Sequence, residues 1–168
     1  MLQQHYLSAR VHASRLQALR VVELVSSFQD AAIFLHLTRY CIEDTHEDDE
    51  ADTDAMDALC GALRADTRGH IKCLAARSLD IDNAQATTLA GAVASVATCG
   101  LRSLDLDENE IDDEGATSVV RILLDRASRH IPLVVSMRHQ KKALSAAGRA
   151  AMMEAVAADA SANLQLRL

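Results

Sequence analysis

One apolar pattern recurs along this 168-residue chain and constrains its fold more than any other feature. In the stretch LRSLDLDENEI, Leu101 to Ile111, apolar residues and one asparagine occupy the template L-x-x-L-x-L-x-x-N-x-I. The same frame occurs upstream at Ile71, Leu74, Ala76, Leu79 and Ile81, and again at Ala32, Leu35, Leu37, Tyr40 and Ile42. Weaker copies follow at Val135, Met137, Leu144 and Gly148, and then at Leu164, Leu166 and Leu168.

This spacing predicts a repeated unit of one strand, one turn and one helix. Alternating apolar residues at the start of each copy are typical of a strand with one buried face. Amphipathic segments follow the copies over residues 53–63, 83–98 and 112–126, and Asn83, Asp112 and Ser145 stand where helix N-caps are expected. A single unit cannot bury its own apolar face. We therefore expect the units to stack into an α/β fold with a parallel sheet covered by helices.

The pattern resembles the leucine-rich repeat family, and the long helical half of each unit resembles its ribonuclease-inhibitor-like subfamily. The resemblance covers residues 32–168 and is most specific at Leu101 to Gly115. It implies a short solenoid with the parallel sheet on its concave side and helices on its convex side, and a protein that binds rather than catalyses. The unit spacings of 30 and 39 residues exceed the family's usual spacing of about 20 to 29. Two units also carry Leu79 and Tyr40 at the asparagine position, so their turns are expected to differ or to use other hydrogen-bond partners.

The same stretch offers a calcium-loop alternative. Asp105, Asp107 and Asn109 occupy the first three alternating ligand positions of an EF-hand loop. The sixth position, however, holds Glu110 where the loop needs glycine, and the twelfth holds Ala116 where a bidentate glutamate must close the site. We therefore predict no metal site and interpret the stretch as a repeat.

Residues 1–31 precede the first copy and have two interpretations. Apolar residues recur every third position from Leu16 to Phe28 and Ser14 can cap them, which favours a helical cap over the open end of the first unit. The segment also carries three arginines and no acid before Glu23, a composition typical of a mitochondrial presequence. The cap is the preferred interpretation and implies a cytoplasmic protein, whereas the presequence implies a mitochondrial one.

An acidic insertion, EDTHEDDEADTD at residues 43–54, separates the first strand copy from its helix. Like charges at this density are typical of a solvated loop, which is the favoured interpretation. The alternative is a docking tail for basic partners.

Composition and motifs disfavour several function classes. The net charge of -7 repels phosphate backbones, and aromatic residues at 2% leave few rings to stack on bases. No apolar run approaches the length of about 18 residues that a membrane span requires. Cys41, Cys60, Cys73 and Cys99 form no C-x-x-C pair, the histidines form no zinc motif, and no nucleophile elbow or phosphate-binding glycine loop is present. We expect no catalytic residues, no cofactor, no nucleic acid and no membrane contact.

Side-chain alternation along the strands predicts an outward-facing binding surface. Leu104 is expected to face the core and Asp105 the solvent. Three outward rows follow: His36, Ala75, Asp105 and Ser136; then Thr38, Arg77, Asp107 and Arg138; then Arg39, Ser78, Glu108 and His139. The predicted partner-binding residues are His36, Thr38, Arg39, Arg77, Asp105, Asp107, Glu108, Arg138 and His139.

The predicted function is that of a non-catalytic protein-interaction or scaffold module. Its outward rows form a patch of mixed charge with an acidic centre, which favours a protein partner with a basic or mixed-charge surface. The alternative is a structural or assembly subunit of a larger mitochondrial complex. The last strand copy, Leu164 to Leu168, adds an expectation of self-association or docking, because an edge strand presents unpaired backbone groups.

Overall fold

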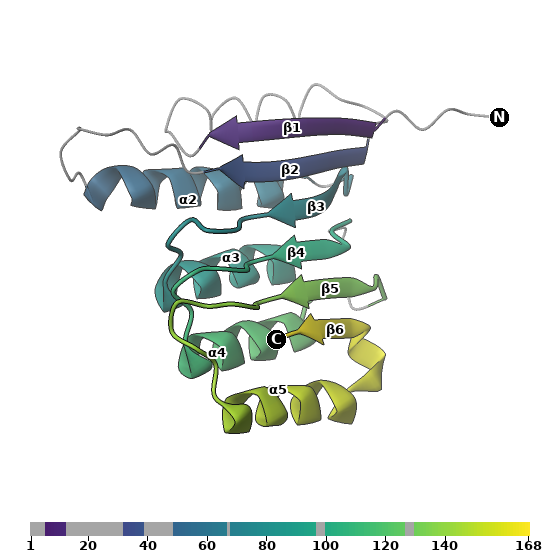
Figure 1. The fold of residues 1–168 in the computed structure, drawn as a ribbon. Helices are drawn as coiled ribbons and strands as arrows, with labels where there is room; N and C mark the ends of the chain where they lie inside the picture. Colours follow the sequence, from purple (N-terminus) through teal and green to yellow (C-terminus); the bar gives the residue numbers. More distant parts are fainter. Residues whose placement is uncertain (1–5, 13–31, 39–48, 67, 97–99, 127–129) are drawn as a thin grey trace.

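A computed structural model describes residues 6–12, 32–38, 49–66, 68–96, 100–126 and 130–168, with backbone alone described for 6–12, 32–38, 49–55, 58 and 160 (Figure 1). Within these residues the chain is an α/β protein whose six strands form one parallel sheet in sequence order. The strands are β1 (Tyr6–His12), β2 (Ala32–Thr38), β3 (Ile71–Ala75), β4 (Ser103–Asp105), β5 (Leu133–Ser136) and β6 (Leu164–Arg167). The predicted α/β class and parallel sheet are confirmed.

The helices lie in the same order on one face of the sheet (Figure 1). They are α2 (Asp49–Ala65), α3 (Asn83–Ser95), α4 (Asp113–Leu124) and α5 (Ala146–Ala158), and a short 3-10 helix, η1 (Ala160–Ala162), precedes β6. No helix among the described segments combines the length and apolar character needed to cross a bilayer.

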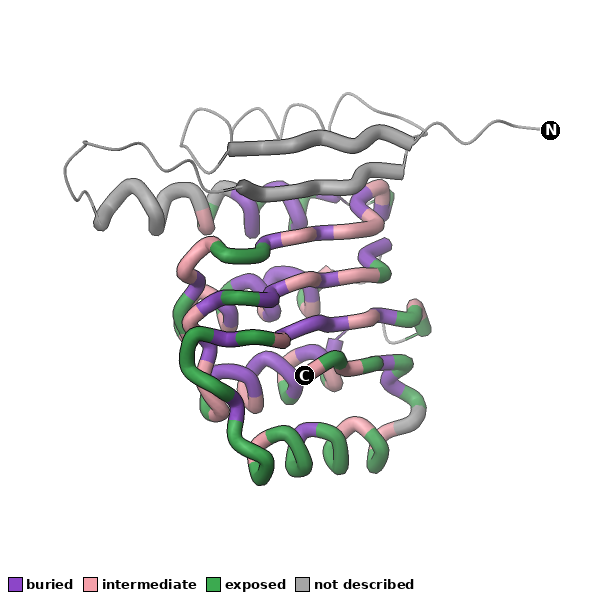
Figure 2. The backbone as a smooth tube through the Cα atoms, viewed as in Figure 1, coloured by how far each residue is buried: buried purple, intermediate pink, exposed green. Residues whose placement is uncertain are grey.

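The core lies between the sheet and the helices and contains the template residues. Leu101, Leu104, Leu106 and Ile111 are all buried, and so are their counterparts Ile71, Leu74, Ala76 and Ile81. The helices contribute buried residues at the predicted spacing, among them Leu89, Val93, Val119, Leu123 and Met152. Buried residues follow the strands and the inner sides of α3 and α4, whereas α5 is largely exposed (Figure 2).

The N-terminal segment differs from the prediction at residues 6–12. The sequence places them in a helical cap, but they form β1, which pairs with β2 from Tyr6 opposite Ala32 to His12 opposite Thr38. The local sequence YLSARVH alternates polar and apolar residues with the period of two that favours a strand. The predicted helical stripe from Leu16 to Phe28 lies outside the described residues.

Helix α2 begins inside the acidic insertion. The sequence predicts a solvated loop over residues 43–54 and a helix over 53–63, whereas α2 spans Asp49–Ala65. Acidic residues at a helix N-terminus interact favourably with the helix dipole, which explains why the helix extends into the acidic run. The earlier part of the insertion, residues 43–48, lies outside the described residues.

N-cap side chains precede the next three helices, α3, α4 and α5. Asp112 caps α4 by accepting from the backbone N–H groups of Glu114 (3.0 Å) and Gly115 (3.2 Å), and Ser145 caps α5, as predicted. The α3 prediction is wrong by one residue, because Asp82 is the N-cap and Asn83 is the first helical residue. Asp82 is favoured as the cap because Gln85 completes a capping box with it.

Asn83 instead connects its helix to the next unit. Its Nδ2 group donates to Asp112 Oδ1 (2.8 Å), and the backbone N–H of Asp112 donates back to Asn83 Oδ1 (3.1 Å). One unit later Asp113 occupies the same helical position and accepts from the backbone N–H of Ser145 (2.9 Å). The start of α3 is thereby bonded to the start of α4, and the start of α4 to the start of α5.

This bonding leaves no room for a side chain on the facing turn. A Cβ atom at Gly115 would lie 2.1 Å from Asn83 Oδ1, and one at Gly148 would lie 2.4 Å from Asp113 Oδ1. Real Cβ atoms do not approach so closely. The glycines near the starts of α4 and α5 are therefore required by the close approach of the preceding unit.

Asn109 satisfies the backbone where β4 leads into α4. Its Oδ1 atom accepts from the backbone N–H groups of Leu79 (2.9 Å) and Ile81 (3.1 Å) in the preceding unit. Its Nδ2 group donates to three carbonyl oxygens, those of Ala76 (2.8 Å), Leu106 (2.9 Å) and Asp107 (3.2 Å). Leu79 occupies the asparagine position of its own unit. The backbone of its turn is hydrogen-bonded instead by Asn109 of the neighbouring unit.

Gln140 takes the same role one unit later. Its Nε2 group donates to the Leu106 carbonyl (2.8 Å), and its Oε1 atom accepts from the backbone N–H of Ile111 (3.2 Å). These groups are the counterparts of those that Asn109 holds. Gln140 follows Met137 by three residues, as Asn109 follows Leu106, so glutamine replaces asparagine at the template position.

Gly115→Ala is expected to destabilise the protein by about 1–3 kcal/mol, because the new Cβ would overpack against Asn83. Gly91 in α3 is the matched control, since a Cβ there meets nothing within 4 Å. Gly91→Ala is expected to stabilise by about 0.5–1 kcal/mol through helix propensity alone. Urea unfolding followed by circular dichroism measures both changes. A Gly115→Ala protein as stable as Gly91→Ala would contradict the close approach of Asn83.

Candidate functional site

The outward row that begins at β2 is in register across the sheet. His36 pairs with Ala75, Ala75 with Asp105, and Asp105 with Ser136. Strand β6 adds Arg167 opposite Ser136. The backbone register of the first predicted row is therefore confirmed, and the row has two members more than predicted, Arg167 of β6 and Arg10 of β1, which pairs with His36.

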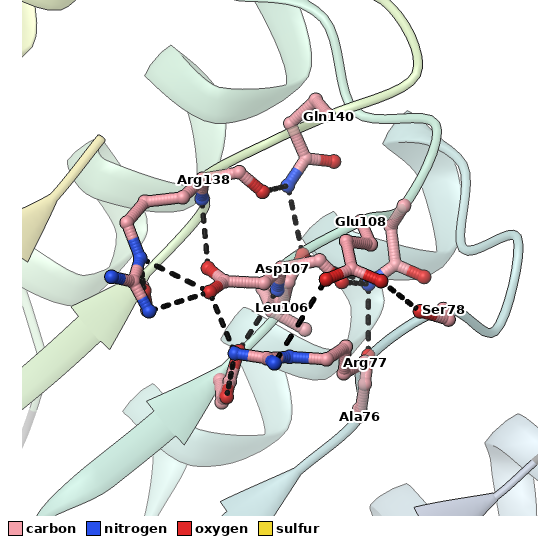
Figure 3. Close-up of polar contacts among 11 residues, drawn as sticks. Ala76, Arg77, Ser78, Leu106, Asp107, Glu108, Arg138 and Gln140 are labelled. Atoms are coloured by element: carbon pink, nitrogen blue, oxygen red, sulfur yellow. Dashed lines mark hydrogen bonds and ion pairs between the residues drawn. The ribbon is translucent and has the colours of Figure 1, made fainter.

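The second row centres on Asp107, which lies between arginines from the two neighbouring units (Figure 3). Its Oδ2 atom accepts from Arg77 Nη2 (3.0 Å), Arg138 Nη2 (2.9 Å) and Arg138 Nε (3.1 Å). Its Oδ1 atom accepts from the backbone N–H of Arg138 (2.8 Å). One carboxylate thus connects three consecutive strand–helix units.

Asp107 is fully buried, which corrects the prediction that it is an accessible partner-binding residue. Strand β4 ends at Asp105, so the alternation that was extended to Asp107 no longer applies there. The guanidinium groups of Arg77 and Arg138 cover the carboxylate from the neighbouring units. The acidic centre predicted for the outer surface therefore lies beneath two cations.

Hydrogen bonding keeps the Asp107 carboxylate ionised. Burial alone would raise the pKa of Asp107, but bonds from the Ser136 hydroxyl and from the backbone and guanidinium of Arg138 lower that pKa below its ordinary value. General bases act best with a pKa near the working pH. This carboxylate is therefore suited to holding arginines in place rather than to accepting a proton in a reaction.

The accessible charges of the outer surface surround Asp107. The side chains of Arg77, Arg138 and Glu108 are 46%, 42% and 47% exposed, and that of Asp105 is 26% exposed. Arg77 also lies 3.3 Å from Asp105 Oδ2 and 3.9 Å from Glu108 Oε1. We name these four residues the outer charge cluster. The cluster presents both signs of charge, and its two arginines are held in place by ion pairs with the buried Asp107.

The third row lies in a repeated turn just beyond the strand ends. Ser78, Glu108 and His139 have φ values of 56°, 61° and 56°, which place all three in the left-handed region. Non-glycine residues adopt this region infrequently. Ser78 Oγ donates to Glu108 Oε2 (2.7 Å), so adjacent turns are bonded to each other. Residue types do not predict this conformation here, because none of the three is glycine or asparagine.

The remaining predicted site residues are His36, Thr38, Arg39 and His139. His36 and Thr38 belong to β2, of which the backbone alone is described, and Arg39 lies outside the described residues. His139 is exposed and contributes to a pocket of about 220 Å³ that also involves Gln140. The described structure therefore brings together Arg77, Asp105, Asp107, Glu108 and Arg138 of the nine predicted residues.

A second charged group, which the sequence analysis did not single out, lies beside the turns. Lys141 Nζ is bonded to the Asp80 carboxylate and lies 3.1 Å from Glu110 Oε1. Asp80, Glu110 and Lys141 occupy equivalent positions of three successive units. Aligning the units position by position would have revealed this pairing of charges.

The residues of the calcium alternative have other partners. Asp107 is bonded to two arginines, and the Asn109 amide is bonded to five backbone groups. In the part of the chain that the structure describes, no group of three or more His, Cys, Asp or Glu side chains could hold a metal ion. Cys60 and Cys73 are free thiols whose pKa values are raised by burial.

No protein-family model matches the chain, and no curated protein matches it either. The geometry of the outer surface is therefore the basis for assigning a function.

Asp107 is expected to contribute a pH-dependent part of the stability. Its pKa is lower in the folded state than the value of about 3.9 for an unfolded chain, so the contribution is complete above about pH 4 and is lost as the pH falls through the folded-state pKa. Asp107→Asn is expected to lower the free energy of unfolding by about 1–3 kcal/mol at pH 7.

Urea unfolding of both proteins between pH 7 and pH 2 measures this difference. The difference should shrink in acid, because the wild-type carboxyl group then also becomes neutral. A difference that stays constant over the whole range would contradict the ionised, arginine-bonded carboxylate.

Proposed function

We propose that this chain is a leucine-rich-repeat-like solenoid that acts as a non-catalytic protein-interaction or scaffold module. In this proposal the sheet is the concave binding side and the helices form the convex side. The stacking of strand–helix units in sequence order supports it. The equivalent bonding by Asn109 and Gln140, which fixes successive turns in the same way, supports it further.

The anchored arginines of the outer charge cluster carry the functional proposal. Arg77 and Arg138 are each bonded to the buried Asp107, yet nearly half of each side chain remains exposed. Long side chains normally lose rotamer entropy when they bind a partner, and side chains held in advance lose less. Arginine is also among the residues enriched at the energetic centres of protein interfaces.

The signs of charge in the cluster indicate the chemistry of the partner. Carboxylates of the partner would pair with the exposed N–H groups of Arg77 and Arg138, and basic groups would pair with Glu108 and Asp105. A protein surface of mixed charge meets both requirements, and such complementarity favours specific docking. Nucleic acid fits less well, because the net charge of -7 repels a phosphate backbone.

The proposed location is the cytoplasm. Strand β1 supports it, because Tyr6–His12 extends the sheet by pairing with β2 along its whole length. The alternative of a mitochondrial structural or assembly subunit rests on the arginines and the lack of acids at the start of the chain. Fusion of residues 1–31 to a reporter, followed by microscopy, separates the two locations.

Glu108→Arg tests the proposed binding surface. This substitution reverses the charge of the most exposed carboxylate of the cluster. It should lower the binding affinity for a partner with a matching surface by roughly tenfold or more. Asp125→Arg is the matched control, because it reverses the exposed carboxylate that follows the C-terminus of α4. Both variants should melt close to the wild-type temperature, as exposed substitutions usually do.

Tagged wild-type protein and both variants would be used for affinity capture from cells that make the protein, with quantitative mass spectrometry. The proposal predicts proteins captured by the wild type and by Asp125→Arg but depleted with Glu108→Arg. If all three proteins capture the same set in equal amounts, the outer charge cluster is not the binding surface.

A further inference from the structure

A groove between α5 and β6 lies at the last strand–helix unit of the described structure. Its volume is about 530 Å³, and its lining combines the apolar side chains of Met153, Leu166 and Leu168 with the arginines Arg138, Arg149 and Arg167. Met153 is 51% exposed. A lining of apolar side chains and arginines favours a ligand that carries apolar and acidic side chains together.

The backbone beside this groove has the hydrogen-bonding pattern of an edge strand. The carbonyl oxygens of Asn163 and Arg167 accept from the backbone N–H groups of Leu133 (2.9 Å) and Met137 (2.8 Å) in and beyond β5. Because successive residues of a strand direct their backbone groups to opposite sides, those of Leu164 and Leu166 face the other edge. No strand pairs with that edge among the residues that the structure describes.

The register of the sheet indicates which types of side chain an added strand would need at each position. Leu104, Val135 and Leu166 are aligned across β4, β5 and β6 and contribute to the core or pack against it. An added strand would therefore need an apolar residue beside Leu166. The same argument asks for a second apolar residue beside Leu168.

Between these apolar positions, the outward row ends at Arg167. This row contains Asp105, which pairs with Arg77 of the neighbouring unit at 3.3 Å. Within the described residues Arg167 has no ion pair. A carboxylate on an added strand could pair with Arg167 across adjacent strands, as Asp105 pairs with Arg77, which follows its register partner Ala75 by two residues.

We propose that the β6 edge and its groove bind an extended segment of another protein by strand addition. The segment alternates apolar, acidic and apolar residues, with the acid beside Arg167 and the apolar residues beside Leu166 and Leu168. Backbone hydrogen bonds supply affinity in this mode of recognition, and the alternate side chains supply specificity. The chain itself contains an internal example, Leu104–Asp105–Leu106 in and after β4, which occupies the corresponding register.

This edge site shares Arg138 with the outer charge cluster that carries the proposed function, but its test changes no residue of that cluster. The two proposals can fail separately, because the test of one changes Glu108 and the test of the other changes Arg167.

The probe is a capped synthetic peptide, LRSLDLDENE, which copies residues 101–110 of this chain. It would be titrated to concentrations on the order of millimolar, which detects weak association, into the isotopically labelled full chain with amide shifts followed by NMR. The expected result is saturable shifts at residues 163–168 and at Met153. A second peptide, with Asp105→Lys and Asp107→Lys, should bind the wild-type protein more weakly.

Charge reversal on the protein completes the test. Arg167→Glu should weaken binding of the acidic peptide by roughly three- to tenfold, and it should bind the lysine peptide more tightly than the wild type does. Arg121→Glu, at an exposed position on α4, is the matched control and should change neither affinity.

Three results would overturn the proposal. The first is the absence of saturable shifts at residues 163–168, and the second is an affinity that Arg167→Glu leaves unchanged. The third is a set of shifts at these amides that depends on protein concentration without peptide, which would assign the edge to a second copy of the chain.

Discussion

The side chain of Asn109 joins five backbone groups of two successive units, and the geometry of the outer surface depends on it. An unpaired buried polar group is costly, so each turn keeps the conformation that satisfies these bonds. Asp107 and Glu108 precede Asn109 in its own turn, where the Asn109 amide donates to the Leu106 and Asp107 carbonyls. Their positions decide where Arg77 and Arg138 are anchored. A polar interaction inside the fold therefore determines which charges reach the surface.

The core and the register were predictable because both follow from strict periodicity. Inward residues such as Leu104 and Leu106 repeat from unit to unit, and an aligned repeat fixes which residues face one another. The burial of Asp107 was not predictable in this way. Alternation describes the direction of a side chain in a strand, whereas Asp107 lies beyond β4 and is covered by long side chains from other units.

Other features were missed because the signal lay in the comparison of units rather than in residue types. Gln140 is a different residue from Asn109, yet it has the same offset from the strand and the same bonds. Gly115 and Gly148 stand at one position because the preceding helix approaches there, not because the backbone requires glycine. Strand β1 was missed because the arginines and apolar residues of the N-terminal segment also fit a helix.

Amide hydrogen exchange tests most directly whether Asn109 and Gln140 each hold the preceding turn. Asn109→Ala should accelerate exchange at the amides of Leu79 and Ile81, which donate hydrogen bonds to Asn109 Oδ1. Gln140→Ala should instead accelerate exchange at the amide of Ile111, which donates to Gln140 Oε1. In the wild-type protein all three amides should exchange slowly. Fast exchange at these amides in the wild type, or the same pattern of acceleration in both variants, would contradict the account.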